Sequence, residues 1–496
     1  MKKRVERLRG MYDLLPETYQ RQRWITDRLQ KFLMQAGYAA VDTPILEQGD
    51  LFLTSFGQEL WQNLYAFRLH QRDLCLRPEY TASICRLYLD YFQQQALPVR
   101  FQYAGPIFRY EAPGHNRYRQ HTQLGVELLG GQAAAADADI LYLACDILRE
   151  LHIPDYRLEL GHIGVVSGFI QRLNLDDHAA RLLLSLMEQI SRSDEGEQAA
   201  QARLEALYPP NAQEPAGTEA QETHSRNILT LLNGISISFG DEAARTEIVE
   251  RFLWKAGRVE QRRQILYALE FLRTLHSLSG PPPAVFAQIR DLLDRYQLDA
   301  APLLELEQLV ETVKECGVQD EQIVLNLALG RGVSYYTGLV FEIHARDENG
   351  FDAQLCGGGR YDRLVRAVGG ARDVNACGFA FGLERLLSLL PERELPLFIP
   401  TQALVIPVSQ QDIPYAQQVA RKARTMHVSA EVDVTGRGVS AGLRMAAKRQ
   451  MALALIVGEN ERRARAITVH DLKTGREDVI SFDNPDQSIE MKEQYL

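Results

Sequence analysis

Between Phe101 and Gly130 the chain reads FQYAGPIFRY EAPGHNRYRQ HTQLGVELLG, and this stretch decides how everything around it is organised. Two mostly apolar runs, Phe101–Phe108 and Leu124–Leu129, predict the two strands of a hairpin. The run between them, Arg109–Gln120, is polar and contains three arginines. Clustered surface arginines repel one another and surface ion pairs contribute little stability. A basic hairpin tip is therefore either simply solvated or built to bind an anion that matches the guanidinium fork.

Two motifs inside this hairpin resemble those of a known family. FRYE at 108–111 and RYRQHTQLGVELLG at 117–130 are similar to the second signature motif of class II aminoacyl-tRNA synthetases, in the form that histidyl-tRNA synthetases carry. The resemblance implies an α+β fold, in which an antiparallel sheet flanked by helices is joined to a helical insertion and a C-terminal α/β domain similar to an anticodon-binding domain. It also implies an enzyme that activates histidine with ATP.

The composition is that of a globular chain with several domains. Its 496 residues are 46% hydrophobic and 24% charged, which predicts two to four domains. The sequence contains no run of eighteen apolar residues, so we expect no membrane span. The charged N-terminus lacks the apolar run of a secretory signal. The six cysteines form no CxxC pair, so we expect neither a zinc site nor disulfides, and a cytoplasmic protein. A net charge of −10 argues against a general nucleic-acid coat but allows local basic surfaces.

The N-terminal part predicts a helix, a short strand and a break. Apolar residues recur with helical spacing over Tyr19–Ala36, and the pattern ends at Gly37. Ala39–Val41 predicts a strand, which Pro44 interrupts because it has no N–H to donate to a ladder. Gly37–Pro44 resembles the first class II motif, which forms the dimer interface in that family. The resemblance therefore implies a homodimer.

The segment Asp73–Arg86, DLCLRPEYTASICR, predicts a strand followed by a helix with Thr81 in its first turn. The carboxylate of Glu79 and the hydroxyl of Thr81 then lie beside exposed backbone N–H groups, which suits either an ammonium ligand or a capped helix start. The segment resembles the RPEGT motif of histidyl-tRNA synthetases, whose Glu and Thr hold the amino group of histidine. Tyr80 replaces the glycine of that motif, and would either crowd the pocket or turn outward.

Three further motifs follow in the second half of the chain: RGVSYYTG at 331–338, GGGRYD at 357–362 and GFAFGLER at 378–385. In this order and spacing they resemble the two histidine-specific motifs and the third class II motif. The glycines of GGGRYD either let the backbone approach a ligand closely or form a flexible turn. Ser334 stands where the family has an aspartate, which weakens one expected supporting contact.

The order of the motifs predicts four segments. The catalytic core takes residues 1–164 and 321–391, and a helical insertion takes 165–320, with a mobile linker near 208–224. The insertion serves either as a contact for the tRNA acceptor end or as a spacer. Residues 401–496 predict a small domain of alternating strands and helices, in which basic residues gather. These residues either contact a phosphate backbone or form solvated helix faces.

The resemblance implies which residues contact ATP and carry the chemistry. Arg109 and Arg331 would lie on the α-phosphate and act as the catalytic groups. The other ATP contacts would come from Glu111 at the adenine, Arg117 at the outer phosphates and Arg385 at the γ-phosphate. Mg²⁺ would bridge the phosphates through few protein carboxylates, and no residue is expected to be a dedicated metal ligand.

The resemblance also implies which residues bind histidine. Three residues would hold its ammonium group: Glu79, Thr81 and Gln123. Two would lie against its imidazole nitrogens, Glu127 and Tyr336, and the same pocket would contain Tyr335 and Arg331. A buried carboxylate that needs a partner rejects side chains without an N–H, which gives selectivity for histidine without editing.

Two functions fit these motifs. The first is histidine–tRNA ligase, with histidine and tRNA(His) as substrates. The alternative is a histidine-sensing regulatory subunit of ATP phosphoribosyltransferase, which would not charge tRNA and whose partner would be that enzyme's catalytic subunit. Such paralogues usually lack the C-terminal domain and ATP-contacting arginines. This chain has residues 401–496 together with Arg109, Arg331 and Arg385, which favours the ligase.

Overall fold

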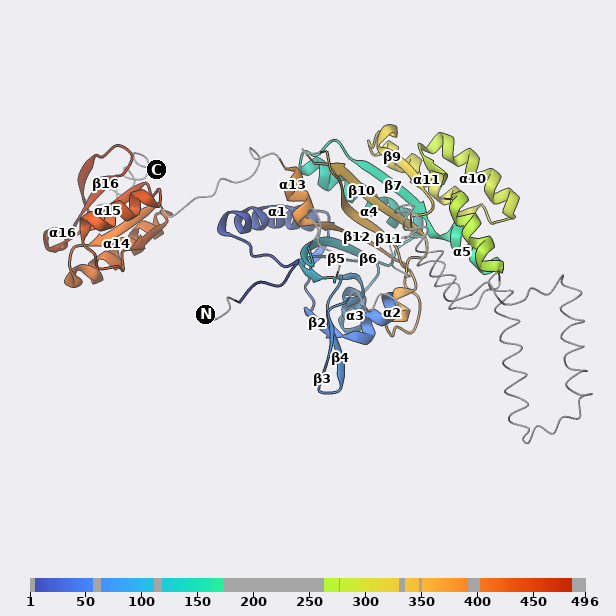
Figure 1. The fold of residues 1–496 in the computed structure, drawn as a ribbon, viewed down its shortest axis with the longest axis horizontal. Coiled ribbons are helices and arrows are strands. Elements are labelled where there is room, and N and C mark those ends of the chain that lie inside the picture. Colours follow the sequence, from blue (N-terminus) through green and yellow to red (C-terminus); the bar gives the residue numbers. More distant parts are fainter. Residues whose placement is uncertain are drawn as a thin grey trace, which may run out of the picture. The chain divides into compact units, whose positions relative to one another are not determined.

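The computed structural model describes residues 5–56, 64–110, 118–173, 263–275, 277–329, 335–347, 350–390 and 402–483. The chain divides into two units, Met1–Leu395 and Pro396–Leu496 (Figure 1). None of the helices in these described ranges combines the length and the hydropathy that crossing a bilayer requires.

Unit 1 is built on a nine-stranded sheet with the order β1-β5-β6-β12-β11-β10-β7-β9-β8. Its central strands, from β5 to β7, pair in antiparallel fashion, while β1 pairs with β5 and β7 with β9 in parallel. The α+β class predicted from the sequence is confirmed. The strands are β1 (Ala39–Ala40), β5 (Val99–Phe108), β6 (Gln120–Leu129), β7 (Arg157–His162), β8 (Ser279–Gly280), β9 (Ile323–Asn326), β10 (Leu339–Arg346), β11 (Asp352–Arg360) and β12 (Ala376–Gly382).

The hairpin predicted from the sequence is present in this sheet. β5 and β6 pair continuously, from Val99 opposite Leu129 to Phe108 opposite Gln120. Both strands are longer than the apolar runs that predicted them, because backbone pairing does not require apolar side chains and continues into the polar start of β6. The part of the tip from residue 111 to 117 lies outside the described ranges.

Alternation of side chains along β6 separates the two faces of the sheet. Leu124, Val126 and Leu128 point into the main hydrophobic core. Glu127, between them, points to the opposite face. Several helices contribute side chains to the main core, among them the helical residues 263–275 together with α1 (Pro16–Gln35), α4 (Ala133–Glu150), α5 (Ile163–Arg172), α10 (Pro282–Tyr296), α11 (Ala301–Glu315) and α13 (Leu383–Leu389). A second core on the opposite face joins β5 to α3 (Thr81–Tyr91) and α12 (Leu364–Ala367).

Helix α1 confirms the helix predicted near the N-terminus. It begins with Pro16, whose fixed backbone angle and missing N–H suit the first turn. Ile25, Leu29 and Leu33 recur every four residues and are fully buried. The helix ends before Gly37, which has a φ of +86° and so supplies the left-handed conformation that commonly closes a helix.

A small sheet comes before α3 in the chain. It has the order β2-β4-β3, with β2 (Leu46–Gln48), β3 (Ala66–Leu69) and β4 (Arg72–Leu76), and α2 (Gly49–Phe56) follows β2 directly. β4 contains the strand predicted before the RPEYT segment. It delivers the chain to residues 77–80 and then to α3, so this sheet sets where that segment lies.

The three glycines of the GGGRYD motif lie inside a strand, so of the two alternatives that the sequence left open the flexible turn is wrong. Gly357, Gly358 and Gly359 pair with β10 on one side and β12 on the other. A Cβ atom at Gly358 would lie 2.7 Å from the ring of Phe341, and one at Gly359 would lie 2.8 Å from the ring of Tyr336. The glycines therefore make room for aromatic rings on the two faces of the sheet.

Unit 2 has a five-stranded sheet of its own, with the order β14-β13-β15-β16-β17. Along β13, Ala403 and Val405 pack in the core that contains α14, whereas Leu404 and Ile406 pack in the core that contains α15. Helices therefore cover both faces, as the alternating strands and helices of the sequence predict. The elements are β13 (Ala403–Pro407), α14 (Ile413–Thr425), β14 (Ala430–Val432), α15 (Val439–Lys448), β15 (Leu453–Val457), α16 (Glu459–Ala464), β16 (Ala466–Asp471) and β17 (Glu477–Ser481).

The boundaries of the four predicted segments stay predictions. Of the insertion predicted over 165–320, residues 174–262 lie outside the described ranges, and with them the linker predicted near 208–224. The described end of that segment contains α10 and α11, which are integrated into unit 1. Leu292 of α10 and Leu306 of α11 lie in the main core.

Candidate functional site

Glu127 lies at the centre of the candidate site. It is almost fully buried on the face of β6 opposite the main core. Three hydroxyl groups from three different parts of the chain donate to its carboxylate. Thr81 Oγ1 and the Tyr103 hydroxyl lie 2.8 and 3.1 Å from Oε1, and the Tyr361 hydroxyl donates to Oε2. These contacts fix the orientation of the carboxylate.

Glycines on the neighbouring strands allow this arrangement. Gly378 of β12 pairs with Glu127 across the ladder, and a Cβ atom there would overlap the Glu127 carboxylate. Gly125 pairs with Tyr103, and a Cβ atom there would lie 2.6 Å from the Tyr103 hydroxyl. The polar groups of Glu127 and Tyr103 can therefore lie close to the sheet backbone.

The RPEYT segment brings a second buried carboxylate to the same place. Glu79 Oε2 accepts from the backbone N–H of Thr81 over 2.7 Å, and Oε1 accepts from that of Ala82 over 3.0 Å. The capped helix start that the sequence allowed is thus present at α3. Each carboxylate oxygen has two lone pairs, so capping leaves Glu79 able to accept from a further donor.

Burial raises the pKa of both carboxyls. Burial raises the pKa of Glu127 to about 8, against the opposing effect of the Tyr361 and Thr81 hydroxyls. Burial also raises the pKa of Glu79, and the N–H of Ala82 opposes the rise. Within the described ranges neither carboxylate has an ion-pair partner. Two such carboxylates in one pocket favour a ligand that brings positive charge and N–H donors.

Three further predicted histidine contacts lie within the described ranges: Gln123, Tyr335 and Tyr336. Gln123 lies on the same face of β6 as Glu127, and its Oε1 atom is buried without a hydrogen-bond partner in the described part of the chain. That orphaned acceptor fits an ammonium group. Tyr335 and Tyr336 are half-buried, with ring centroids 5.0 Å apart, and Tyr335 lies 5.8 Å from the ring of Tyr361. Contacts thus join Glu79, Thr81 and Glu127 directly, and Tyr361 connects Tyr335 to Glu127.

Tyr80 does not turn outward. Its side chain is fully buried and its ring stacks on that of Tyr103, with centroids 4.2 Å apart and planes 12° apart. Its hydroxyl donates to Asp42 over 3.1 Å. Of the two alternatives that the sequence left open, the outward one is wrong.

The predicted ATP contacts are only partly within the described ranges. Arg109 donates from Nε to the carbonyl of Pro78 over 2.9 Å, which places its side chain at the RPEYT segment. Arg385 donates from Nη1 to the carbonyl of Gln354 in β11 over 2.6 Å. Glu111, Arg117 and Arg331 lie outside the described ranges, so their positions stay predictions.

Two functional candidates were missed by sequence reasoning. Tyr103 lies in the apolar run that predicted β5, and Tyr361 belongs to the GGGRYD motif, but neither had a role. Both hydroxyls donate to Glu127. Side chains alternate between the two faces along β5. Once the pairing of β5 with β6 is known, this alternation places Tyr103 on the same face as Glu127. Sequence alone does not supply the pairing of β6 with β12 that brings Tyr361 close.

The arginine of the same motif is structural. Arg360 is 4% exposed and forms a two-pronged contact with Asp137 of α4, over 3.0 and 2.8 Å, and a further one with Asp362 over 2.8 Å. Its pairing with Cys377 in the ladder places it on the α4 side of the sheet, away from Glu127. It therefore ties β11 to α4.

The N-terminal segment supports the third motif. Glu384, next to Arg385, accepts from the Tyr12 hydroxyl over 2.5 Å and from the backbone N–H of Thr122 over 2.8 Å. Desolvation and the nearby Glu384 carboxylate raise the pKa of Tyr12. These contacts join residue 12, the start of β6 and the start of α13.

Several basic residues of unit 2 are used locally. Arg449 pairs with Glu431, Arg462 with Asp412, Arg463 with Glu459 and Arg465 with Asp483. Arg444 and Lys448 are exposed and lie four residues apart on α15, so they share a face of that helix. These two form the better candidate for a phosphate contact.

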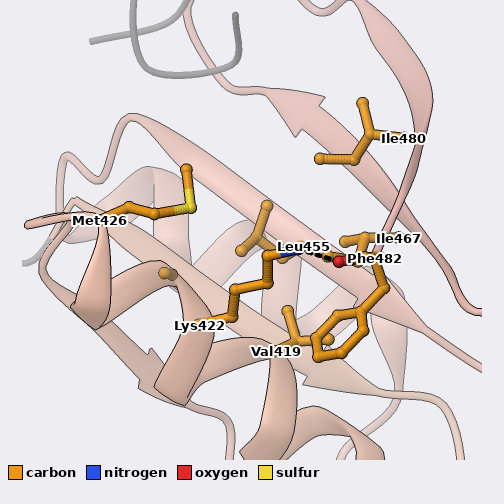
Figure 2. Close-up of a pocket in the computed structure, with 8 residues that line it drawn as sticks. Val419, Lys422, Met426, Leu455, Ile467, Ile480 and Phe482 are labelled. Atoms are coloured by element: carbon orange, nitrogen blue, oxygen red, sulfur yellow. Dashed lines mark hydrogen bonds between the residues drawn. The ribbon is translucent and has the colours of Figure 1, made fainter. Parts of the chain in front are cut away.

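A pocket in unit 2 has a different character (Figure 2). Its lining is apolar except for Lys422, whose amine donates to the carbonyl of Phe482. The lining residues are Val419, Lys422, Ala423, Met426, Leu455, Ile467, Ile480 and Phe482. Because its one charged group already has a partner, this pocket lacks the polar groups that an amino acid or a phosphate requires.

Comparison with known proteins covers nearly the whole chain. The family model for histidyl-tRNA synthetase matches residues 10–231 and 258–386, and the model for an anticodon binding domain matches residues 402–489. The histidine–tRNA ligase of Methanococcus maripaludis is 27% identical over 477 residues, which cover 96% of this chain and 97% of that protein. The histidine–tRNA ligase of Pyrococcus abyssi is 28% identical, covering 97% of each.

Solved structures share the fold. The crystal structure of apo histidyl-tRNA synthetase from S. aureus superposes with a TM-score of 0.60 at 22% identity, over 97% of this chain and 98% of that one. At this identity the likeness concerns the arrangement of strands and helices, including the large sheet and the separate C-terminal sheet.

Proposed function

The chain belongs to the histidyl-tRNA synthetase family, and on that premise we propose that it is a histidine–tRNA ligase that works through the pocket around Glu127. The reaction has two steps: histidine and ATP give histidyl-adenylate, and the histidyl group then passes to the 3′ end of tRNA(His). The first step needs a site that recognises the amino acid before ATP reacts, and the second step starts from the adenylate held in that site.

One observation carries the assignment to this pocket. Two buried carboxylates, Glu127 and Glu79, are linked through Thr81, whose hydroxyl donates to Glu127 and whose N–H donates to Glu79. Histidine supplies an ammonium group and an imidazole N–H, so it can satisfy both at once. In the proposal Glu79, Thr81 and Gln123 hold the ammonium group, while Glu127 and Tyr336 hold the imidazole, with Tyr335 beside them.

We also assign roles to two tyrosines that the sequence did not single out. The hydroxyls of Tyr103 and Tyr361 donate to Glu127 and orient its carboxylate before histidine binds. An amino acid without a side-chain N–H would leave this buried carboxylate unpaired. Such a mismatch typically costs 10⁴–10⁵ in selectivity for sites built around a hydrogen bond, by order of magnitude.

In the first step, a carboxylate oxygen of histidine attacks the α-phosphorus of ATP. A new O–P bond forms, the bond between the α-phosphorus and the bridging oxygen breaks, and pyrophosphate leaves. Negative charge gathers on the α-phosphate during this exchange. In the proposal Arg109 and Arg331 stabilise that charge, because a guanidinium can contact two phosphate oxygens at once.

The rest of ATP would be held in line by groups on the hairpin and on α13. Arg117 is proposed for the outer phosphates, Arg385 for the γ-phosphate and Glu111 for the adenine. Mg²⁺ is expected to accompany the phosphates, where it would neutralise the charge of the leaving pyrophosphate. In the described ranges no group of three or more His, Cys, Asp or Glu side chains is arranged to hold a metal ion. As the resemblance implies, Mg²⁺ would be held mainly by the phosphates.

In the second step, a ribose hydroxyl at the 3′ end of the tRNA attacks the carbonyl carbon of the adenylate. An ester bond forms and the hydroxyl gives up its proton. The bond between the carbonyl carbon and the phosphate oxygen breaks, and AMP leaves with its electron pair. Unit 2 is proposed to contact the anticodon region, with Arg444 and Lys448 on the phosphate backbone. Binding through such contacts weakens as salt rises, because each neutralised phosphate releases counterions.

The proposal includes a homodimer in the cytoplasm. Four apolar side chains that come after the first class II motif in the sequence are exposed: Ile45, Leu46, Phe67 and Leu69. Leu46 lies in β2, and Phe67 and Leu69 lie in β3 of the small sheet. Burying them between two copies would be favourable. The six cysteines are all free, which suits a reducing compartment.

Charging of tRNA tests the proposed function. Purified protein, ATP, Mg²⁺, labelled histidine and a tRNA(His) transcript should give acid-precipitable histidyl-tRNA, and a tRNA of another specificity should not. The alternative, a regulatory subunit of ATP phosphoribosyltransferase, predicts histidine binding without charging. A protein that binds histidine and changes the activity of that enzyme's catalytic subunit, but charges no tRNA, would replace the ligase proposal.

A further inference from the structure

Tyr80 occupies the position where the resembling motif has glycine, and it is built firmly into the fold. It lies between Glu79 and Thr81, the two residues of this segment that face the carboxylate pocket. Its own side chain is 0% exposed. The Tyr80 hydroxyl donates to Asp42 Oδ1 over 3.1 Å, and the guanidinium carbon of Arg77 lies 4.0 Å from the centre of its ring.

The neighbouring strand is adapted to this ring. A Cβ atom at Gly105 of β5 would overlap the Tyr80 hydroxyl and would lie 2.9 Å from Nη2 of Arg77. Any larger residue at position 105 would displace the ring or the guanidinium. Tyr80 thus packs against Gly105 and Arg77 and donates to Asp42, and these four residues form one packed unit.

The other side of the unit is the site itself. The ring of Tyr80 stacks almost parallel on that of Tyr103, with centroids 4.2 Å apart. The hydroxyl of Tyr103 donates to Glu127 over 3.1 Å. Gly125 leaves the space that this hydroxyl occupies. Contacts therefore run from Asp42 through the Tyr80 ring and the Tyr103 ring to the carboxylate.

We infer that Tyr80 is a positioning residue for histidine recognition: it holds the Tyr103 ring so that its hydroxyl stays aligned on Glu127. The inference rests on the proposed function, because it assigns Glu127 to the imidazole. Tyr80 itself is not proposed to contact histidine or ATP. Its effect should appear in the affinity for histidine, not in the affinity for ATP or in the rate constant of adenylate formation.

Replacing the ring tests the inference. Tyr80→Leu removes the stacked ring, and stacked aromatic pairs contribute enough to change an affinity about 2- to 10-fold. Calorimetry should therefore show histidine binding weakened by about that factor, with the KM for histidine raised to match and kcat and the KM for ATP unchanged. Tyr80→Phe keeps the ring and should recover most of the loss. Tyr91→Leu, at an exposed tyrosine of the same helix, is the matched control.

A double-mutant cycle tests the path through Tyr103. In a Tyr103→Phe background the hydroxyl that Tyr80 positions is absent, so adding Tyr80→Leu should cause no further loss of histidine affinity. Equal losses in both backgrounds would overturn the inference. A parallel loss of histidine and ATP affinity in Tyr80→Leu would also overturn it, since that pattern indicates general damage.

A second variant approaches the same ring from β5. Gly105→Ala should displace the Tyr80 hydroxyl and weaken histidine binding, and Tyr80→Phe should restore binding in that variant by removing the atom in the way. Unchanged histidine affinity in Gly105→Ala would contradict the inference even if Tyr80→Leu fails to fold. Wild-type affinity in Tyr80→Leu would overturn this inference alone. A wild type that binds no histidine would overturn the proposed function as well.

Discussion

Thr81, the first residue of α3, donates its hydroxyl to Glu127 in the middle of β6 over 2.8 Å. The two residues are 46 positions apart in the sequence and belong to different elements, α3 and β6. Because the backbone N–H of Thr81 also donates to Glu79, one residue connects the carboxylate proposed for the imidazole with the one proposed for the ammonium group. If the proposed roles hold, one hydrogen-bonded cluster recognises both ends of histidine.

Removing the central carboxylate should separate histidine binding from ATP binding. Glu127→Ala leaves three hydroxyl donors without their acceptor and removes the proposed partner of the imidazole. We expect histidine affinity to fall by about 100-fold or more, the upper end of what a hydrogen bond to a charged group contributes. ATP affinity should survive, and calorimetry measures both.

Glu342→Ala is the matched control for that experiment. Glu342 is a carboxylate of the same sheet, in β10, and contacts His344 over 3.0 Å. Its loss should leave histidine affinity unchanged. If Glu127→Ala binds histidine as the wild type does, the assignment of Glu127 to the imidazole is wrong.

Histidine binding should release a proton near neutral pH. Burial raises the pKa of Glu127 to about 8, above the ordinary value of 4.5, so at pH 7 the empty site holds this carboxyl mostly protonated. Accepting an imidazole N–H beside the substrate ammonium group favours the ionised form, so the proton must leave on binding. Calorimetry in two buffers of different ionisation enthalpy counts that proton.

The control for proton release is Glu127→Gln, which cannot ionise. It should release close to one proton fewer than the wild type at pH 7, and the difference should shrink as the pH rises well above 8. Equal proton release by the two proteins would show that Glu127 keeps its protonation state when histidine binds.

The sequence predicted the central hairpin because each of its strands has an apolar run of strand length, bounded by a polar tip. It did not predict the strand through Gly357–Gly359, because three glycines favour a turn locally. Pairing with β10 and β12 on both sides outweighs that preference.

The candidate site shows the same limit. Glu79, Thr81 and Glu127 were identified by their place in motifs, and the structure brings them together. Tyr103 and Tyr361 were not, because their contacts with Glu127 depend on the register of strands that are distant in sequence. The outcome for Tyr80 also needed the structure, since the space that it fills is created by Gly105.

Loss of Arg331 should damage the chemical step more than binding. This residue is proposed to stabilise charge that appears only as the α-phosphate is attacked, so Arg331→Ala should lose about 10²–10³ in the rate of adenylate formation. Histidine and ATP binding should remain measurable. Arg331→Lys should recover little, because an ammonium group is a point charge where a planar fork is needed.

Single-turnover adenylate formation in a rapid-quench instrument measures this effect. Arg331→Ala with the wild-type rate would place the stabilising charge on another residue. A variant that fails to bind either substrate would instead assign Arg331 to binding.

The chain should form a dimer at micromolar concentration. Light scattering should give twice the 56.2 kDa of one chain. Leu46→Glu combined with Phe67→Glu should shift the mass towards the monomer, because buried charge opposes association. Leu304→Glu, at an exposed leucine of α11, should leave the dimer intact. A monomeric wild type would contradict the interface proposed from the first class II motif.

The most direct test of the central claim is amino-acid-dependent exchange of pyrophosphate into ATP by the purified wild-type protein. Only an enzyme that forms an adenylate reversibly returns labelled pyrophosphate to ATP. We predict exchange with histidine and none above background with any other standard amino acid, and we predict that Glu127→Ala lowers the exchange at subsaturating histidine by about 100-fold. A protein that binds histidine yet catalyses no exchange with any amino acid would contradict the account.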